Sequence, residues 1–234
     1  MERLTDAAEL LDGPLDDRRV LAGNLLDLRR INRLLGGVRL SRLAIDRLVD
    51  GASEVSMLDV GTGGADIPVA LLADARRRGR RMQIVGIDVR AEVLAAARDV
   101  RPVIGRLADL SLDVSDGRAL PHPDRSFDIV HASLVVHHFE PDEAVALLRE
   151  MTRVARLGVV VNDVARGPIN LAWSRLMVAV LTRNRYTRND APLSVRRAYT
   201  LDEMRGLLAR AGLRPIAELG VFGGHRFAVA AVRA

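Results

Sequence analysis

The 234-residue sequence predicts a doubly wound α/β fold whose sheet is mostly parallel. From residue 55 onward, short runs rich in Val, Ile and Leu alternate with amphipathic stretches. Continuous apolar runs of this kind are typical of parallel strands that helices cover on both faces. The end of the chain differs, because two β-like runs flank a short turn at Gly223 and Gly224. This turn predicts a hairpin that adds an antiparallel strand to the sheet.

The predicted elements follow one another without a repeat or a low-complexity linker. Thr200 and Glu203 have the spacing of a capping box, which favours a helix that starts at this point. Parallel strands are expected at residues 55–60, 83–89, 107–114, 127–133 and 157–163. Helices are expected at residues 65–78, 91–100, 141–155 and 201–211, and the hairpin at residues 215–221 and 225–232.

The N-terminal part of the chain is expected to be helical. Leu21 and Leu25 lie near one helix face, and Arg29 lies off that face. A basic amphipathic helix can rest on a membrane, or it can cap a domain and close over a pocket. We favour the cap, and we divide the chain into an N-terminal helical cap at residues 1–52 and a main domain at residues 53–234.

Composition narrows the range of functions. The absence of cysteine excludes disulfides and thiolate metal sites, and the five histidines show no i, i+4 pair, so no metal site is expected. The net charge is +5, and every basic residue is arginine. The densest run, at residues 76–81, falls where a helix should end, and arginine there complements the helix dipole. We therefore expect a solvated helix end rather than a nucleic-acid site.

The sequence also bears on membranes and on location. No apolar run is long enough to span a bilayer, so no integral membrane segment is expected. The N-terminal residues lack the basic and apolar regions of a signal peptide, which favours a cytoplasmic protein. The sequence leaves the oligomeric state open, with a homodimer as one option.

The segment LDVGTGGAD at residues 58–66 places a glycine turn between the first strand and the first helix. Doubly wound folds bind ligands at this edge of the sheet, where glycines let a ligand approach the backbone. A dinucleotide-binding turn would have its third glycine at position 66, which Asp66 occupies. A carboxylate there opposes a pyrophosphate on the same amides. The turn therefore favours a positively charged ligand without phosphate, and S-adenosylmethionine meets this description.

Together with later motifs, this turn resembles that of the class I S-adenosylmethionine-dependent methyltransferases, and the resemblance covers roughly residues 53–232. In that family an acidic residue precedes G-x-G-x-G. Asp59, Gly61 and Gly63 match this pattern, whereas Ala65 replaces the third glycine. The resemblance implies a seven-stranded Rossmann-like sheet and S-adenosylmethionine as the cofactor. It implies a cofactor turn made of Asp59, Gly61, Thr62, Gly63 and Gly64.

Three later segments carry the same resemblance. VGIDV places Asp88 at the end of the second strand, where the family binds the ribose hydroxyl groups, and Val89 follows it. SDGRALPHPDRSFDIV resembles the family's adenine-binding stretch, so Asp116 is expected to bind the amino group and the Gly117 amide a ring nitrogen. HASLVVHHF resembles the family's exit from the fourth strand, which adds Ser133 to the expected cofactor site.

Two histidines, His137 and His138, follow the fourth strand at the edge where the cofactor's methyl group is expected. Histidine titrates near neutral pH and can accept the proton of an oxygen nucleophile. Because the two are adjacent, we expect only one to face the acceptor, and we favour His138, which abuts Phe139. Asp163, at the end of the fifth strand, is expected to orient the imidazole. Asn162 beside it either bonds a substrate hydroxyl or caps the loop.

Residues 164–200 are expected to form a lid over the acceptor. Only 3% of the residues are aromatic, yet Trp173, Tyr186 and Tyr199 all fall here. Rings with polar tips suit a pocket for an aromatic or lipidic molecule, although they also suit the lid's own core. Arg188 adds a group that can contact an anionic or phenolic acceptor.

These residues predict O-methylation of a phenol or enol on a small aromatic, polyketide-like or quinone-like acceptor. C-methylation of a similar ring is the near alternative. A nicotinamide-dependent oxidoreductase is opposed by Asp66 and by the missing third glycine. A non-catalytic cofactor-binding protein is the remaining alternative.

Overall fold

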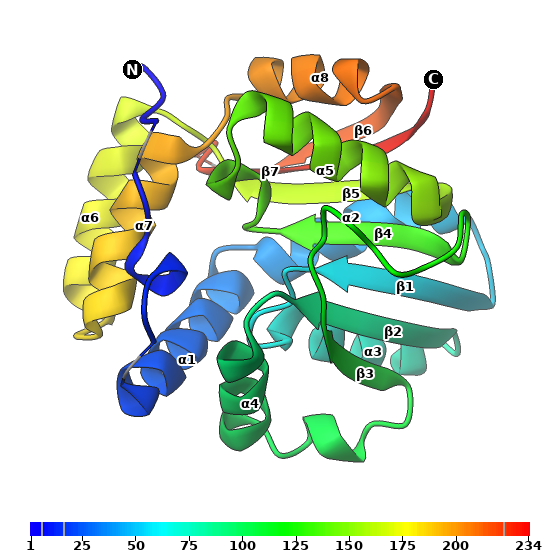
Figure 1. Cartoon of the computed structure of the whole chain (residues 1–234), viewed down its shortest axis with the longest axis horizontal. Coiled ribbons are helices and arrows are strands. Elements are labelled where there is room, and N and C mark those ends of the chain that lie inside the picture. Colours follow the sequence, from blue (N-terminus) through cyan, green and yellow to red (C-terminus); the bar gives the residue numbers. More distant parts are fainter. Residues whose placement is uncertain (6, 16, 222) are drawn as a thin grey trace.

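The sheet of the protein has seven strands in the order β3-β2-β1-β4-β5-β7-β6 (Figure 1). The computed structural model describes the chain except Asp6, Asp16 and Phe222. Strands β1 to β5 pair in parallel, and β7 is antiparallel to both β5 and β6. The predicted fold class is confirmed. The strands are β1 Glu54–Val60, β2 Arg81–Asp88, β3 Leu110–Val114, β4 Phe127–Ser133, β5 Ala155–Val164, β6 Leu213–Gly220 and β7 Arg226–Arg233.

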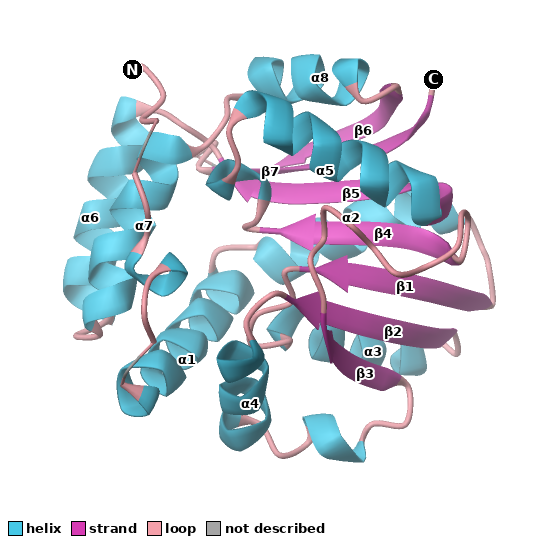
Figure 2. Cartoon of the chain, in the orientation of Figure 1, coloured by secondary structure: helices cyan, strands magenta, loops and turns pink. Residues whose placement is uncertain are grey.

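Helices cover both faces of this sheet (Figure 2). Buried side chains of α1 to α4 belong to the apolar cluster on one face, and those of α5 and α8 to the cluster on the other. The covering helices are α1 Arg18–Leu34, α2 Gly37–Val49, α3 Asp66–Arg77, α4 Ala91–Val100, α5 Pro141–Val154 and α8 Leu201–Arg210. Two further helices, α6 Pro168–Leu181 and α7 Arg185–Arg197, follow β5.

The N-terminal part differs from the expectation of continuous helix. Helix α1 begins only after Asp17, whose carboxylate accepts hydrogen bonds from the first-turn amides of Arg19 and Val20. Before it, the described residues form an extended segment with one short 3₁₀ turn, η1 Leu10–Asp12. Gly13 and Pro14 follow that turn and interrupt helix formation. This N-terminal segment runs beside α7 (Figure 1), where the Leu4 amide bonds the carbonyl of residue 196.

A smaller difference concerns β3, which begins at Leu110 rather than at residue 107. Leu107 ends the 3₁₀ helix η2 Ile104–Arg106, and its carbonyl accepts a hydrogen bond from the Leu110 amide. The chain therefore turns before it can pair with β2. Helix α2 packs directly on β5, β6 and β7, so it is part of the cover of the sheet. The boundary between residues 52 and 53 stays a prediction.

The arginine run at the end of α3 lies among carboxylates. Arg76 contacts Asp109 at 2.8 Å, and Arg78 contacts Asp46 at 2.9 Å. These exposed pairs are consistent with a solvated helix end and contribute little to stability. None of the helices in the described part of the chain has the length and apolar character needed to cross a bilayer.

Candidate functional site

Two neighbouring cavities lie at the carboxyl ends of the parallel strands. One, of about 340 Å³, is lined by the glycine turn and by the ends of β1, β2 and β4. The other, of about 320 Å³, lies among α1, α6 and α7. Leu11, Leu28, Leu134 and His138 line both, so the two cavities meet at these side chains. We call them the turn cavity and the lid cavity.

The glycine turn has the backbone shape that its sequence requires. Gly61 has a φ of 65°, and a Cβ added there would lie 2.5 Å from a methyl carbon of Val135. Only glycine fits such a position. Ala65, which stands where the family has a third glycine, also adopts a left-handed conformation, with φ 50°. It ends the turn directly before α3, and its side chain is fully buried.

Asp88 fixes the turn to β2. Its carboxylate accepts hydrogen bonds from the amides of Gly63 and Arg90, both at 3.0 Å. Burial raises the pKa of Asp88 above its ordinary value. The side chain lines the turn cavity together with Val89, as expected for neighbours at a strand end.

Asp59 has a partner that the sequence did not reveal. Its Oδ1 lies 2.5 Å from Nδ1 of His131, its cross-strand neighbour on β4. Nε2 of His131 lies 2.7 Å from the hydroxyl of Ser41 on α2. All three side chains are buried, so Asp59 is held in one orientation at the floor of the turn cavity. The alternation of β4 could have placed His131 opposite Asp59, but the register between β1 and β4 cannot be read from the sequence.

Asp66 and Asp116 both line the turn cavity. Asp66 is half-buried beside the amide of Asn32 at 3.1 Å, and desolvation raises its pKa. Asp116 is half-buried, and the Arg118 guanidinium at 2.9 Å holds the pKa of its carboxyl below the usual range. Gly117 beside it packs tightly, because an added Cβ would lie 2.5 Å from Val60.

At the wall of the lid cavity, a buried arginine connects four elements. The guanidinium of Arg226 on β7 donates to Asn162 at 2.7 Å, to Asn32 at 2.6 Å and to Ser133 at 2.8 Å. Complete burial lowers its pKa to about 10. Asn162 also donates to the hydroxyl of Ser41 at 2.7 Å. It therefore belongs to this network rather than to the wall of either cavity, contrary to its predicted contact with the substrate.

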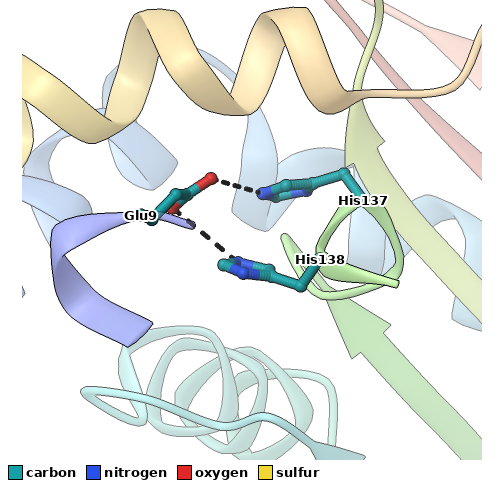
Figure 3. A group of neighbouring side chains, drawn as sticks. All are labelled: Glu9, His137 and His138. Carbon is teal, nitrogen blue, oxygen red and sulfur yellow. Dashed lines mark ion pairs between the residues drawn. The ribbon is translucent and has the colours of Figure 1, made fainter. Parts of the chain in front are cut away.

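The two adjacent histidines point toward the same carboxylate (Figure 3). Nε2 of His137 lies 3.4 Å from Oε1 of Glu9, and Nε2 of His138 lies 3.8 Å from Oε2. Their rings lie 4.4 Å apart. Both rings therefore face the N-terminal segment, and the expectation that only one of them faces the acceptor stays a prediction. The N-terminal segment places the buried Glu9 opposite both rings, and no local pattern indicates this contact.

The carboxylate expected to orient His138 contacts the other histidine. Oδ1 of Asp163 lies 2.7 Å from Nδ1 of His137, whereas Nδ1 of His138 lies 3.1 Å from Asp12 of the N-terminal segment. Burial alone would lower the pKa of His137, but the carboxylates of Asp163 and Glu9 raise it to about 10. His137 is thus protonated at neutral pH and is a poor base. His138 lines both cavities.

Within the described part of the chain, Glu9, His137 and His138 form a group that could hold a metal ion, since their ligand atoms lie within 4.8 Å of one another. Sequence spacing could not reveal this group, because Glu9 is remote in sequence. The proton on His137 and the Arg197 guanidinium, 3.9 Å from Glu9, already supply positive charge. We therefore interpret the group as a cluster in which protonated His137 and Arg197, rather than a metal ion, balance the charge of the carboxylates.

The predicted lid residues divide between wall and core. Trp173 lines the lid cavity. Tyr186 and Tyr199 are buried, and the Tyr199 hydroxyl donates to the carbonyl of residue 139 at 2.8 Å. Arg188 is exposed and points away, with its guanidinium 3.5 Å from the carbonyl of Ala179. These last three line neither cavity, because Tyr186 and Tyr199 pack in the two apolar clusters that flank the sheet and Arg188 faces solvent. The sequence missed the polar groups that do: Asn24, Asp27, Thr187, Asp190 and Ser194.

A family described as "Methyltransferase domain" matches residues 58–161. Phosphatidylethanolamine N-methyltransferase of Cereibacter sphaeroides is 36% identical over 120 residues, which are 48% of this chain and 54% of that protein. Ajmaline N-methyltransferase of Rauvolfia serpentina is 32% identical over 108 residues, 45% of this chain and 34% of that one. The ubiquinone/menaquinone biosynthesis C-methyltransferase UbiE of Xanthomonas campestris pv. campestris is 34% identical over 102 residues, which are 44% of this chain and 38% of that protein. The chain thus spans from about a third to about half of the length of these relatives.

Solved structures extend the likeness over nearly the whole fold. A SAM dependent methyltransferase from Aquifex aeolicus superposes with a TM-score of 0.64 at 21% identity, covering 91% of this chain and 98% of that one. Human N-acetylserotonin methyltransferase in complex with SAM gives a TM-score of 0.67 at 15% identity, with 93% and 57% covered. Mitomycin 7-O-methyltransferase MmcR gives a TM-score of 0.58 at 22% identity, covering 87% of this chain and 56% of that one. At these identities the structures support the fold.

Proposed function

We propose that this chain, a class I S-adenosylmethionine-dependent methyltransferase by its matched domain and its fold, methylates a small apolar molecule bound in the lid cavity. One observation carries the proposal. The turn cavity and the lid cavity meet at His138 and at three leucines, so a molecule in one can contact a molecule in the other. Holding nucleophile and methyl group at contact distance is the main requirement of in-line methyl transfer.

The turn cavity suits S-adenosylmethionine. Asp88, at the end of β2, is the acceptor we assign to the ribose hydroxyls, and Asp116 with the Gly117 amide is assigned to the adenine. Asp59 and Asp66 put negative charge near the glycine turn, where the ligand's sulfonium and ammonium groups are favoured. A pyrophosphate would meet the same carboxylates unfavourably, which argues against a nicotinamide cofactor.

The lid cavity suits an aromatic or quinone-like acceptor with a polar substituent. Its wall is largely apolar and includes Leu28, Ile31, Met177 and Val195. Asn24, Thr187 and Ser194 add polar groups, which can orient a bound molecule. The relatives named for N-methylation and C-methylation do not decide the acceptor atom.

His138 is the base that we assign to O-methylation. Its Nε2 would accept the proton of a phenol or enol. S-adenosylmethionine, when bound in the turn cavity, would supply the methyl group, with S-adenosylhomocysteine as the leaving group. Asp12, 3.1 Å from Nδ1, favours the tautomer that carries its proton on Nδ1, and Nε2, which faces Glu9 at 3.8 Å, is then the nitrogen left to accept a proton. Carbon methylation needs no such base when the ring carbon is already nucleophilic, so it is the second candidate.

Two measurements test the proposed function. Calorimetry is expected to show binding of S-adenosylhomocysteine and none of NADH. Incubation with methyl-labelled S-adenosylmethionine and a panel of phenols, hydroxyquinones and amines is expected to label a phenolic oxygen, and mass spectrometry of the product distinguishes O-, C- and N-methylation. Tight binding of NADH alone would overturn the proposal. Cofactor binding without turnover on any acceptor of the panel would support a non-catalytic protein.

A further inference from the structure

Helix α6 presents an apolar stripe to the outside of the molecule. Ile169, Trp173, Leu176 and Val180 are spaced i, i+4, i+7 and i+11, so they lie on one helix face. Their exposed fractions are 79%, 41%, 57% and 74%. Val178 is the one residue of α6 that is buried. A helix of this composition normally buries such a face.

The stripe continues onto α1. Leu34, at the end of α1, is 69% exposed, and Leu181, at the end of α6, is 41% exposed. Both side chains line the lid cavity together with Trp173. Helix α6 packs on α7 at the margin of the molecule, on the side away from the sheet (Figure 1). Contiguous exposed apolar surface of this kind marks a site of interaction.

Positive charge surrounds the apolar stripe. Residues 164–189 contain no Asp or Glu. Arg175 and Arg183 are exposed beside the stripe, and Arg29 and Arg33 are exposed on α1. Apolar residues with a tryptophan, flanked by arginines, are typical of helices that lie in the headgroup region of an anionic bilayer. In a symmetric contact with a second copy, the same arginines would face each other and repel.

We propose that α6 and the end of α1 form a docking surface for an anionic lipid bilayer, with the Ile169–Val180 stripe inserted among the headgroups. Leu34, Trp173 and Leu181 then bring the opening of the lid cavity against the bilayer. An apolar acceptor can pass from lipid into the cavity without crossing water. This last consequence rests on the proposed function, whereas docking itself does not.

Vesicle binding tests the docking directly. Trp173 is the only tryptophan of the chain, so its fluorescence reports on α6 alone. With vesicles of phosphatidylcholine and phosphatidylglycerol, we expect the protein to sediment, Trp173 emission to shift to the blue, and brominated lipids to quench it. Phosphatidylcholine vesicles alone and high salt are both expected to weaken binding strongly. Equal binding to neutral vesicles, or no blue shift, would overturn the proposal.

Matched variants show whether binding depends on the α6 stripe or on exposed apolar and basic residues in general. Leu176→Asp and Val180→Asp are each expected to reduce vesicle partitioning at least about tenfold. Ile216→Asp, at an exposed apolar position on β6, is the control and is expected to leave partitioning unchanged. Arg175→Gln with Arg183→Gln is expected to remove the preference for anionic vesicles, whereas Arg76→Gln with Arg77→Gln is not.

Two further readouts keep the outcomes distinct. Unchanged binding of S-adenosylhomocysteine by the Asp variants shows that the fold and the turn cavity are intact. Light scattering of the native protein is expected to give a monomer. A dimer that Leu176→Asp dissociates would instead identify the stripe as a contact between two copies and would overturn bilayer docking. Loss of methyl transfer with docking retained would contradict the proposed function alone.

Discussion

Asp88 combines two tasks at the end of β2. It holds the glycine turn through the Gly63 amide, and it faces the cavity that we assign to the cofactor. Loss of a buried hydrogen-bond partner typically costs about 1–3 kcal/mol. We therefore expect Asp88→Ala to weaken binding of S-adenosylhomocysteine by roughly tenfold or more, measured by calorimetry. Asp113→Ala, exposed on the neighbouring strand β3, is the control. Unchanged affinity of the Asp88 variant would remove it from the cofactor site.

His138 is the residue whose loss should affect the chemical step. General-base catalysis typically contributes about 10²–10⁴-fold, so His138→Ala is expected to lower kcat within that range while cofactor affinity stays near normal. Asp12→Asn is expected to lower kcat less, because it only orients the ring. His122→Ala, beside Phe127, is the control. Full kcat in His138→Ala would favour an acceptor that is already ionised or carbon-nucleophilic.

His137 stabilises the fold rather than acting as a general base. Its pKa in the folded protein is raised from 6.5 to about 10, so its contribution to stability is complete below pH 6.5 and is lost as the pH rises through about 10. The expected contribution is on the order of a few kcal/mol. In urea unfolding between these pH values, the advantage of the native protein over His137→Gln should shrink steadily. An advantage independent of pH would show that His137 is neutral in the folded state.

At the scale of elements, the N-terminal segment closes the site from outside the sheet. The carboxylate of Asp190 on α7 accepts hydrogen bonds from the amides of Leu10 and Leu11, at 2.8 Å and 3.1 Å. These bonds hold Glu9 and Leu11 at the two cavities. The N-terminal segment therefore depends on α7 for its position, and in turn it covers part of α7.

Asp190→Ala should release this segment. We expect the KM for the acceptor to rise several-fold and proteolysis near the N-terminus to accelerate, because the two amides lose a shared acceptor worth about 1–3 kcal/mol. Asp190→Asn retains one carbonyl oxygen and should lie between native protein and Asp190→Ala. The expectation fails if both variants match the native protein in protease sensitivity and in KM.

At the scale of the whole molecule, Arg226 ties the antiparallel hairpin to the parallel sheet and to α1. Its guanidinium holds Asn162 of β5, Ser133 of β4 and Asn32 of α1. The group is fully buried, and Asp66 and Asp163 interact favourably with its charge. The network therefore joins α1, β4, β5 and β7 beside both cavities, since Asn32 and Ser133 line the turn cavity and Arg226 lines the lid cavity.

Arg226→Ala is expected to lower the free energy of unfolding by about 3–5 kcal/mol, as is usual when one member of a buried charged network is removed. Arg226→Lys keeps the charge but not the three-way geometry, and it should recover only part of the loss. Denaturant unfolding with both variants measures this. A loss below about 1 kcal/mol in Arg226→Ala would show that the network relaxes without its centre.

The sequence determined the order along the chain of the seven strands and of α3, α4, α5 and α8, together with the glycine turn and the terminal hairpin, because each depends on local periodicity and on turn residues. The cofactor residues of the turn were implied by the resemblance to the class I methyltransferases, which rests there on one continuous segment from Asp59 to Gly64. Their roles stay predictions.

Only the tertiary structure decided how the histidines are paired. Asp12 reaches His138 across 126 positions of sequence, and Asp163 reaches His137 across 26. The choice between these partners depends on where the N-terminal segment crosses the strand ends, which no periodicity records. The buried contacts of Arg226 have the same origin, because burial and long-range hydrogen bonding are properties of the packed chain rather than of any one segment.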